Sequence, residues 1–231
     1  MCNQIKISFY KFLRFRVFYL AVLFMVFFGA YTGWTMESHD FSVREGLELS
    51  IRDTSIMFMV TLVTSWFVGS DFGTRTIHHE LTLGYSRWSV LLVRELPVML
   101  SSVILHFTCA AVALLVNGYR NGFPGDLFQV QDLFWCLTVS LQLIALQSII
   151  VLISCICATT SSAIAASAVF TFITCNILRN FMDGPIFTRS VFCLARSNTK
   201  ESLVPTAIVA AVTMVITVAT NYLVFRKQEI K

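Results

Sequence analysis

The residues best suited to chemistry lie in one polar segment, residues 70–87, which reads SDFGTRTIHHELTLGYSR. His79 and Glu80 begin like the zinc-binding pattern HExxH, but Leu83 stands where the second histidine is required. The following Gly84–Arg87 lacks the last glycine of a hydrolase nucleophile elbow. The sequence contains no GxxxxGKS/T phosphate-binding loop, so the chain is not expected to hydrolyse ATP by itself. The segment therefore indicates contacts with a partner.

Ser102 and His106 are a second pair that could react, because residues four apart share one face of a helix. An intramembrane enzyme would also need a motif that stabilises an oxyanion, and none accompanies this pair. A neutral His106, hydrogen-bonded to a neighbouring helix, is the preferred interpretation. The seven cysteines show no metal-ligand spacing. We therefore expect no catalytic residue, no metal and no cofactor bound by this chain.

The elements that carry these residues are strongly apolar. Of the 231 residues, 56% are hydrophobic and 13% are charged, and the mean hydropathy is +0.74. Soluble domains contain about 25% charged residues, whereas a membrane span needs about 20 apolar residues. We therefore predict an all-α polytopic membrane protein. Residues 1–231 should form one transmembrane domain, with no room for a separate soluble enzyme domain.

Six apolar runs are long enough to cross a membrane, and aromatic residues lie near their ends, as interfacial residues do. The predicted spans are 17–36, 54–70, 95–116, 133–157, 162–181 and 204–225. Ten of the 17 lysines and arginines lie before the first span, between the second and third, or after the sixth, together with four of the 13 acidic residues when Glu95, the first residue of the third span, is included. This bias predicts that both termini and the 71–94 segment face the cytoplasm from the cell membrane.

Two short amphipathic helices are expected on the cytoplasmic side. Residues 3–16 can place apolar residues on one face and basic residues on the other, which is typical of a helix lying in the membrane interface. Between the second and third spans, Thr76 can begin a short helix near 77–83 that stops at Gly84. Such a helix can transmit the motion of a docked partner to the adjoining spans. A solvated connecting loop is the alternative.

A run of residues with a distinctive order joins the second span to the third. It comprises Asp71-Phe72-Gly73-Thr74-Arg75-Thr76, then Glu80-Leu81-Thr82-Leu83, then Gly84-Tyr85-Ser86-Arg87. This order resembles the membrane subunit of ABC-2 type transporters, as do the six-span plan, the amphipathic segment before the first span and the broken stretch before the sixth. The resemblance departs from the usual pattern at Asp71, where glutamate is commoner, and at His78-His79.

The resemblance implies a permease subunit that pairs with a second copy or a paralogue on two copies of a separate ABC ATPase. ATP and Mg²⁺ would bind to that ATPase, and no nucleic acid is expected as a partner. The short cytoplasmic helix would fit a groove on the ATPase, with polar contacts from Glu80 and Arg75 and apolar docking by Leu81 or Leu83. The implied coupling segment comprises Asp71, Phe72, Gly73, Thr74, Arg75, Glu80, Leu81, Leu83, Gly84, Tyr85 and Arg87.

Small residues in the first and fifth spans are typical of close helix contacts. The candidate residues are Gly29 and Gly33 in a GxxxG pattern, and Ala163, Ala166 and Ser167. In ABC-2 type transporters these two spans meet across the dimer, so the resemblance implies a dimer interface here. Packing within one chain is the alternative.

Aromatic and small polar residues in the first two spans are candidates for the lining of a translocation pathway. They are Phe24, Phe28, Phe58, Thr61, Thr64 and Ser65. Such a lining suits an amphipathic or apolar substrate better than a sugar or an ion.

These features favour the permease subunit of an ATP-binding-cassette exporter that moves an amphipathic substrate outward. Small permeases of this size resemble those that export peptide antibiotics or confer immunity to them. Two alternatives stay open. An ATP-independent channel or carrier would carry polar groups deep in its spans, and a membrane signalling protein would be indifferent to changes at Glu80 and Gly84.

Overall fold

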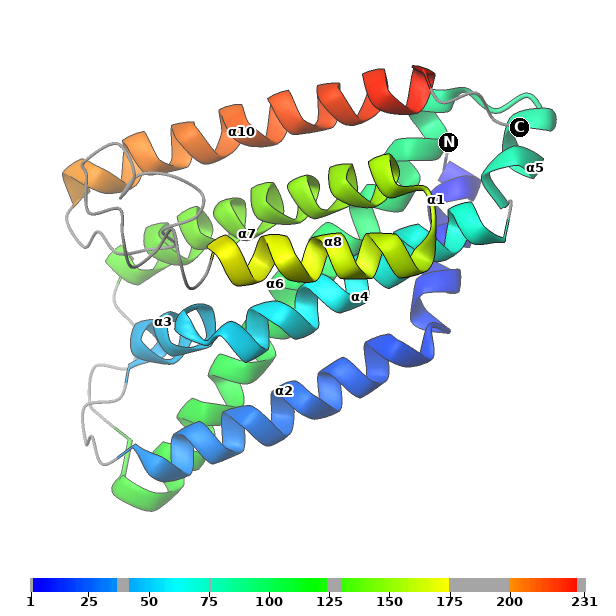
Figure 1. The fold of residues 1–231 in the computed structure, drawn as a ribbon. Helices are drawn as coiled ribbons and strands as arrows, with labels where there is room; N and C mark the ends of the chain where they lie inside the picture. Colours follow the sequence, from blue (N-terminus) through cyan, green and yellow to red (C-terminus); the bar gives the residue numbers. More distant parts are fainter. Residues whose placement is uncertain (1, 37–41, 75, 124–129, 175–199, 228–231) are drawn as a thin grey trace.

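The computed structural model describes residues 2–36, 42–74, 76–123, 130–174 and 200–227, and the regular elements among them are all helices (Figure 1). In chain order these are α1 (Cys2–Leu13), α2 (Arg16–Thr35), α3 (Val43–Arg52), α4 (Thr54–Gly73), α5 (Thr76–Thr82), α6 (Arg87–Asn121), α7 (Val130–Cys157), α8 (Thr160–Phe172) and α10 (Lys200–Lys227). The predicted all-α fold class is confirmed for this part of the chain.

Local side-chain caps fix several helix ends. Ser42 and Glu45 form a reciprocal capping box at the start of α3, and the Asp53 carboxylate accepts from the Ser55 amide at the start of α4. The Ser86 hydroxyl accepts from the amide of Ser89 and so begins α6. These short polar residues satisfy amide groups that a helix leaves unpaired at its N-terminus.

Within the described residues, five helices are long and apolar enough to cross a membrane, namely α2, α4, α6, α7 and α10. The chain is therefore a multi-pass membrane protein, as predicted. The predicted fifth span, 162–181, begins within α8, which is a shorter apolar helix. Positions 175–181 and most of the stretch before α10 lie outside the described residues, so the sixth crossing stays a prediction.

The third span differs from the prediction. It was expected over 95–116, but α6 already begins at Arg87 and continues to Asn121. Helix α6 therefore begins inside the expected cytoplasmic segment 71–94, and near its start Arg94 and the adjacent Glu95 are 4% and 1% exposed. The side of the membrane on which this segment lies stays a prediction. These charged residues interrupt the apolar pattern but not the helix, because polar side chains from other helices form hydrogen bonds with them.

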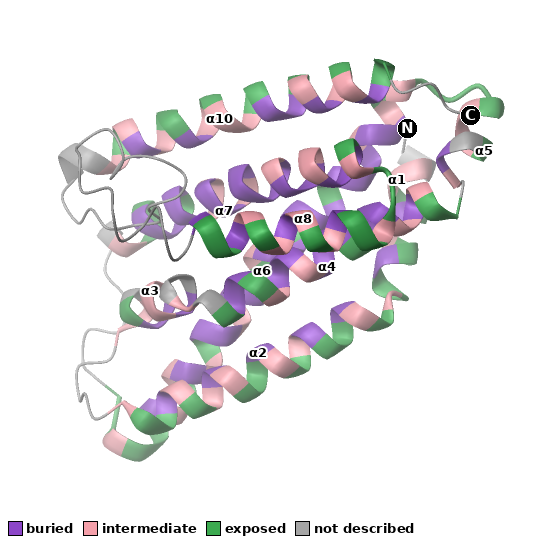
Figure 2. Cartoon of the chain, viewed as in Figure 1, coloured by how far each residue is buried: buried purple, intermediate pink, exposed green. Residues whose placement is uncertain are grey.

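The long helices lie side by side, with α2 and α10 on opposite flanks (Figure 1). Helix α2 packs mainly on α6, α10 packs on α7, and α4 packs on α8. Figure 2 shows that α7 is largely buried whereas α2 and α10 keep broad exposed faces. Helices α1 and α5 and the end of α10 gather at one end of the bundle, on the right of Figure 1. This is the end that carries the bias of positive charge.

Gly29 and Gly33 lie in the contact between α2 and α6 of the same chain. A Cβ atom added to Gly29 would lie 2.5 Å from the Cys109 carbonyl oxygen, and one added to Gly33 would lie 2.3 Å from that of Ala113. The two backbones therefore approach too closely for any side chain at these positions. The packing alternative within one chain accounts for this GxxxG pattern.

Gly33→Ala should destabilise the protein, because the new methyl group would meet backbone rather than a movable side chain. We expect a loss on the order of 1–3 kcal/mol, which is typical of overpacking. Thermal unfolding in detergent measures it.

Gly73→Ala is the matched control, since its Cβ would meet only the Thr160 hydroxyl at 3.4 Å. Equal melting temperatures for Gly33→Ala and the wild type would contradict the close α2–α6 contact.

Candidate functional site

The short helix α5 is attached to the bundle by one apolar face. Its Ile77 is buried with Val90 of α6 and Phe225 of α10, and Leu81 packs against this cluster. Spacing of four residues puts both side chains on the same side of the helix. The sequence had assigned apolar docking to Leu81 or Leu83, and the structure turns Leu81 toward the bundle.

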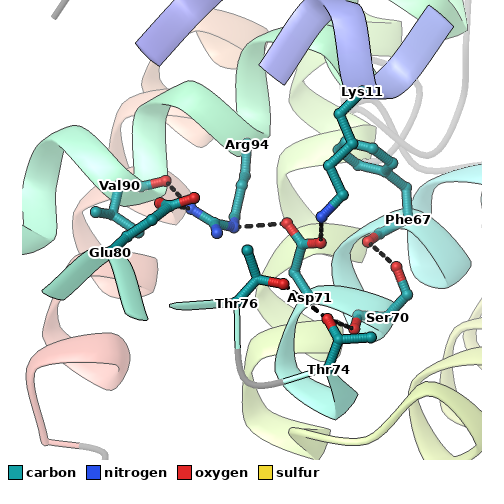
Figure 3. A network of polar contacts seen from close by, with 9 residues as sticks. All are labelled: Lys11, Phe67, Ser70, Asp71, Thr74, Thr76, Glu80, Val90 and Arg94. Atoms are coloured by element: carbon teal, nitrogen blue, oxygen red, sulfur yellow. Dashed lines mark hydrogen bonds and ion pairs between the residues drawn. The ribbon is translucent and has the colours of Figure 1, made fainter. Parts of the chain in front are cut away.

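Arg94 connects α5 to the second and third predicted spans (Figure 3). Its Nε donates to Asp71 Oδ2 of α4 at 2.7 Å, and its Nη1 donates to Glu80 Oε2 of α5 at 2.8 Å. Nη1 also donates to the carbonyl oxygen of Val90, one turn earlier in α6, at 3.0 Å. The planar guanidinium is suited to this task because its donors diverge in a fixed fork.

Lys11 brings α1 into the same network. Its ammonium group donates to Asp71 Oδ1, the carboxylate oxygen that Arg94 leaves free (Figure 3). The side chain of Lys11 is 42% exposed whereas that of Asp71 is 3% exposed, so the buried carboxylate is held between one buried and one accessible cation. A second link joins α1 to α6, where the Ser89 hydroxyl donates to Gln4 Oε1 at 2.6 Å.

Arg87 holds the end of α10. Its Nη1 donates to the carbonyl oxygens of Phe225 and Arg226, at 3.2 and 2.8 Å. A cation at a helix C-terminus satisfies carbonyl groups that lack an amide partner and interacts favourably with the helix dipole. The sequence had placed Arg87 in the coupling segment, and its described hydrogen bonds are to this chain.

The turn between α5 and α6 presents its side chains outward. Leu83 is 61% exposed and Tyr85 is 44% exposed. Between them Gly84 has a φ of +84°, a conformation that residues with a side chain rarely adopt. Its amide donates to the Leu81 carbonyl at 3.0 Å and closes α5, as the sequence predicted. Leu83, Gly84 and Tyr85 are called the α5 tip below.

The other predicted coupling residues line the path from α4 to α5. Phe72 packs against the cluster around Ile77, and Gly73 is exposed at the end of α4. The Thr74 hydroxyl lies 2.8 Å from that of Thr76, which bridges the two helices. Arg75 lies outside the described residues.

The small residues of α8 face the chain's own helices. Ala163 and Ser167 are fully buried, and the Ala163 Cβ lies 3.2 Å from a Cβ built on Gly69 of α4. Ala166 is half-buried. As with Gly29 and Gly33, the structure places these residues in contacts within one chain.

The candidate pathway residues fall into two groups. Phe24 stacks on Phe28 at the edge of the core, and Phe58 is 39% exposed. The polar residues of α4 are bonded within the bundle, as follows: Thr61 to Thr171 at 2.9 Å, Thr64 to Gln147 at 2.8 Å, and Ser65 to the Thr61 carbonyl at 2.8 Å. These bonds hold α4 against α8 and α7.

The Ser102 and His106 side chains do not form a reactive pair. The Ser102 hydroxyl donates to the Met99 carbonyl at 2.8 Å, and His106 Nδ1 lies 2.8 Å from the Ser102 carbonyl oxygen. With that nitrogen as the donor, Nε2 faces Met57 Sδ at 3.2 Å. His106 therefore contacts both its own helix, through the Ser102 carbonyl, and the neighbouring α4, through Met57.

Sequence reasoning missed the contacts of Arg94 and Lys11 with Asp71: it counted Arg94 as a charge that sets orientation, and Lys11 also as part of the basic face of the 3–16 helix. The available signal was the adjacent pair Arg94 and Glu95 after an apolar run, since charges are rarely placed within a span without a partner. Glu80 was expected to contact an ATPase, which stays a prediction; in this chain its carboxylate accepts from Arg94.

Comparison with known proteins adds no relative. No protein-family model matches the chain, and no curated protein matches it. Functional inference therefore depends on the residues and their arrangement.

Arg94→Gln should destabilise the protein, because it leaves the buried Asp71 carboxylate with a single, accessible cation. We expect a loss of about 3 kcal/mol, the lower end for breaking a buried ion pair. Thermal unfolding in detergent tests this, and adding Asp71→Asn should recover part of the loss.

Lys11→Gln is the comparison variant, and its effect should be smaller because the Lys11 side chain is partly in water. A larger effect from Lys11→Gln than from Arg94→Gln would contradict the central position of Arg94.

Proposed function

We propose that this chain is the membrane-spanning permease subunit of an ABC-2 type exporter, driven by a separate ATPase. The observation that carries the proposal is the attachment of α5. Through Arg94, α5 is bonded to both α4 and α6, while Ile77 and Leu81 pack it against α6 and α10. A force applied to α5 would reach the long helices through these contacts.

The α5 tip is the surface proposed to meet the ATPase. Leu83 and Tyr85, directly after α5, offer exposed apolar and aromatic area, whereas Ile77 and Leu81 of α5 are packed on the bundle. Aromatic residues are common anchors in protein interfaces. In addition to the ATPase contact expected from the sequence, Glu80 holds α5 to Arg94, so that the tip keeps a fixed position.

The rest of the assembly follows from this proposal. Two ATPase copies would bind ATP and Mg²⁺, and a second permease or a paralogue would complete the pathway in the cell membrane. Both termini would be cytoplasmic, since α1 and the end of α10 lie beside α5 (Figure 1). The apolar helices suit an amphipathic substrate such as a peptide or an antibiotic.

One observation favours a second candidate, an ATP-independent carrier. Polar side chains are buried in the middle of the bundle, among them Glu95, Gln142 and Gln147, each at most 1% exposed. Carriers place such groups on the path of their substrate. Binding of an ATPase distinguishes the two candidates, because only the permease requires it.

The test is co-expression of the full chain with the ABC ATPase encoded beside it, followed by co-purification and an ATP hydrolysis assay in lipid. We expect a complex with the wild type. The double variant Leu83→Ser, Tyr85→Ala should weaken ATPase binding by about tenfold or more, as loss of interface anchors does.

Tyr119→Ala is the matched control, because Tyr119 is an exposed tyrosine (89%) at the opposite end of α6. If the wild-type chain binds no ATPase, or if Tyr119→Ala weakens binding as much as the tip variant, the proposed docking surface is wrong.

The conformation of Gly84 gives a separate prediction. Gly84→Asn should keep ATPase stimulation, because asparagine tolerates positive φ, whereas Gly84→Val should lose most of it. No atom lies within 4 Å of a Cβ at this position, so crowding does not explain a difference. Equal stimulation by the two variants would show that the shape of the turn is unimportant for coupling.

A further inference from the structure

A buried carboxyl group joins three helices inside the bundle. Glu95 of α6 is 1% exposed, and Asn221 of α10 is fully buried. Asn221 Nδ2 donates to Glu95 Oε1 at 2.6 Å and lies 3.3 Å from the Ser148 carbonyl oxygen of α7. The pair is therefore a polar contact that ties α10 to α6 and α7, in addition to the bonds of Arg87.

Two oxygen atoms of this pair lack a hydrogen-bond donor. Among the described residues, neither Glu95 Oε2 nor Asn221 Oδ1 has a partner. Both are acceptors when the carboxyl group is ionised, so neither can satisfy the other. Buried acceptors without donors are rare in folded proteins, and an ionised one is especially unfavourable.

The charges nearby do not neutralise Glu95. Arg94 uses its described bonds on Asp71, Glu80 and the Val90 carbonyl, and Lys11 bonds to Asp71. These two cations match two carboxylates, Asp71 and Glu80. Arg87 is directed to the carbonyl groups at the end of α10. An ionised Glu95 would thus be a buried negative charge without a cation to pair with it among the described residues.

The other groups around Glu95 do not replace a cation. Among the described residues, the buried Cys155 of α7 lies within reach of the charges of Glu95 and of the neighbouring Arg94. Helix α10 contributes Asn221, which does not titrate. A cysteine thiol is a weak hydrogen-bond donor and carries no positive charge.

We propose that Glu95 is a proton-binding site within the helix bundle, with the proton on Oε2. Binding converts the carboxylate and one proton into a carboxylic acid, and no other reactant is needed. The acid's O–H is the donor that the pair otherwise lacks, and the Asn221 oxygen is an acceptor without a partner. The proton thereby holds α10 to α6.

Release of the proton would leave a carboxylate that requires water. The contact between α6 and α10 would then open. This inference goes beyond the proposed permease function and does not depend on an ATPase.

The experiment is infrared spectroscopy of the full chain in lipid vesicles at neutral pH, without any ATPase. We expect the C=O band of a protonated carboxyl group, shifted by exchange into deuterium oxide and absent from Glu95→Gln. Glu80→Gln is the matched control and should keep the band, because Glu80 is paired with Arg94 as a carboxylate. No such band in the wild type, or its persistence in Glu95→Gln, would overturn the proposal.

Two further measurements keep the test decisive. Glu95→Gln should unfold at the wild-type temperature, because its amide supplies the donor that the proton supplies in Glu95. Asn221→Ala should shift the C=O band, since the acid loses its partner, and an unshifted band would contradict the pairing. Spectra in sodium and in choline salts should agree, and loss of the band in sodium alone would show that a metal cation, not a proton, occupies the site.

Discussion

The ion pairs of the Arg94 guanidinium with the carboxylates of Asp71 and Glu80 are the interaction on which the arrangement of α4, α5 and α6 depends. Arg94 is buried, and Asp71 and Glu80 approach it from two other helices. Charges in a weakly polar surrounding are stable only when they are paired and hydrogen-bonded. Separating α4, α5 and α6 would therefore expose unpaired charges in a place with little water. This constraint gives a seven-residue helix, too short to be stable alone, a fixed position.

Helix α6 is the element on which the other contacts converge. Helix α2 packs closely on it at Gly29 and Gly33. Helix α5 is bonded to it through Arg94, and α10 is bonded to it through Arg87 and Glu95. Helices in a membrane gain little from burying apolar surface against one another, so tight packing and polar bonds specify their arrangement. The bonds of Thr61 and Thr64 do the same for α4 against α8 and α7.

Arg94 and Glu95 are neighbours with different surroundings. One full helical step of about 100° separates their side chains, because a turn holds about 3.6 residues. Arg94 therefore points toward α4 and α5, where two carboxylates meet it, and Glu95 points toward α7 and α10, where an amide meets it. The proposed coupling contact and the proposed proton site thus lie on two different faces of one helix.

Much of the local structure could be predicted from the sequence. The apolar runs predicted the five long helices, and the order from Thr76 to Gly84 predicted a short helix with a glycine stop. Hydrophobic periodicity and helix caps act between residues close in sequence, so the sequence displays them directly. The beginning of α6 was predicted too late, because the apolar run used to place the span was taken to start after the charged residue Arg94.

The sequence by itself determined that the chain forms apolar membrane helices with a polar turn between the second and third. Only the tertiary structure decided which charges meet. Lys11, Asp71 and Arg94 come from different helices, and so do Glu95 and Asn221. It also decided that Gly29 and Gly33 face α6 of the same chain. The physical reason is that ion pairs and close backbone contacts depend on distances between remote segments, which composition and periodicity do not encode.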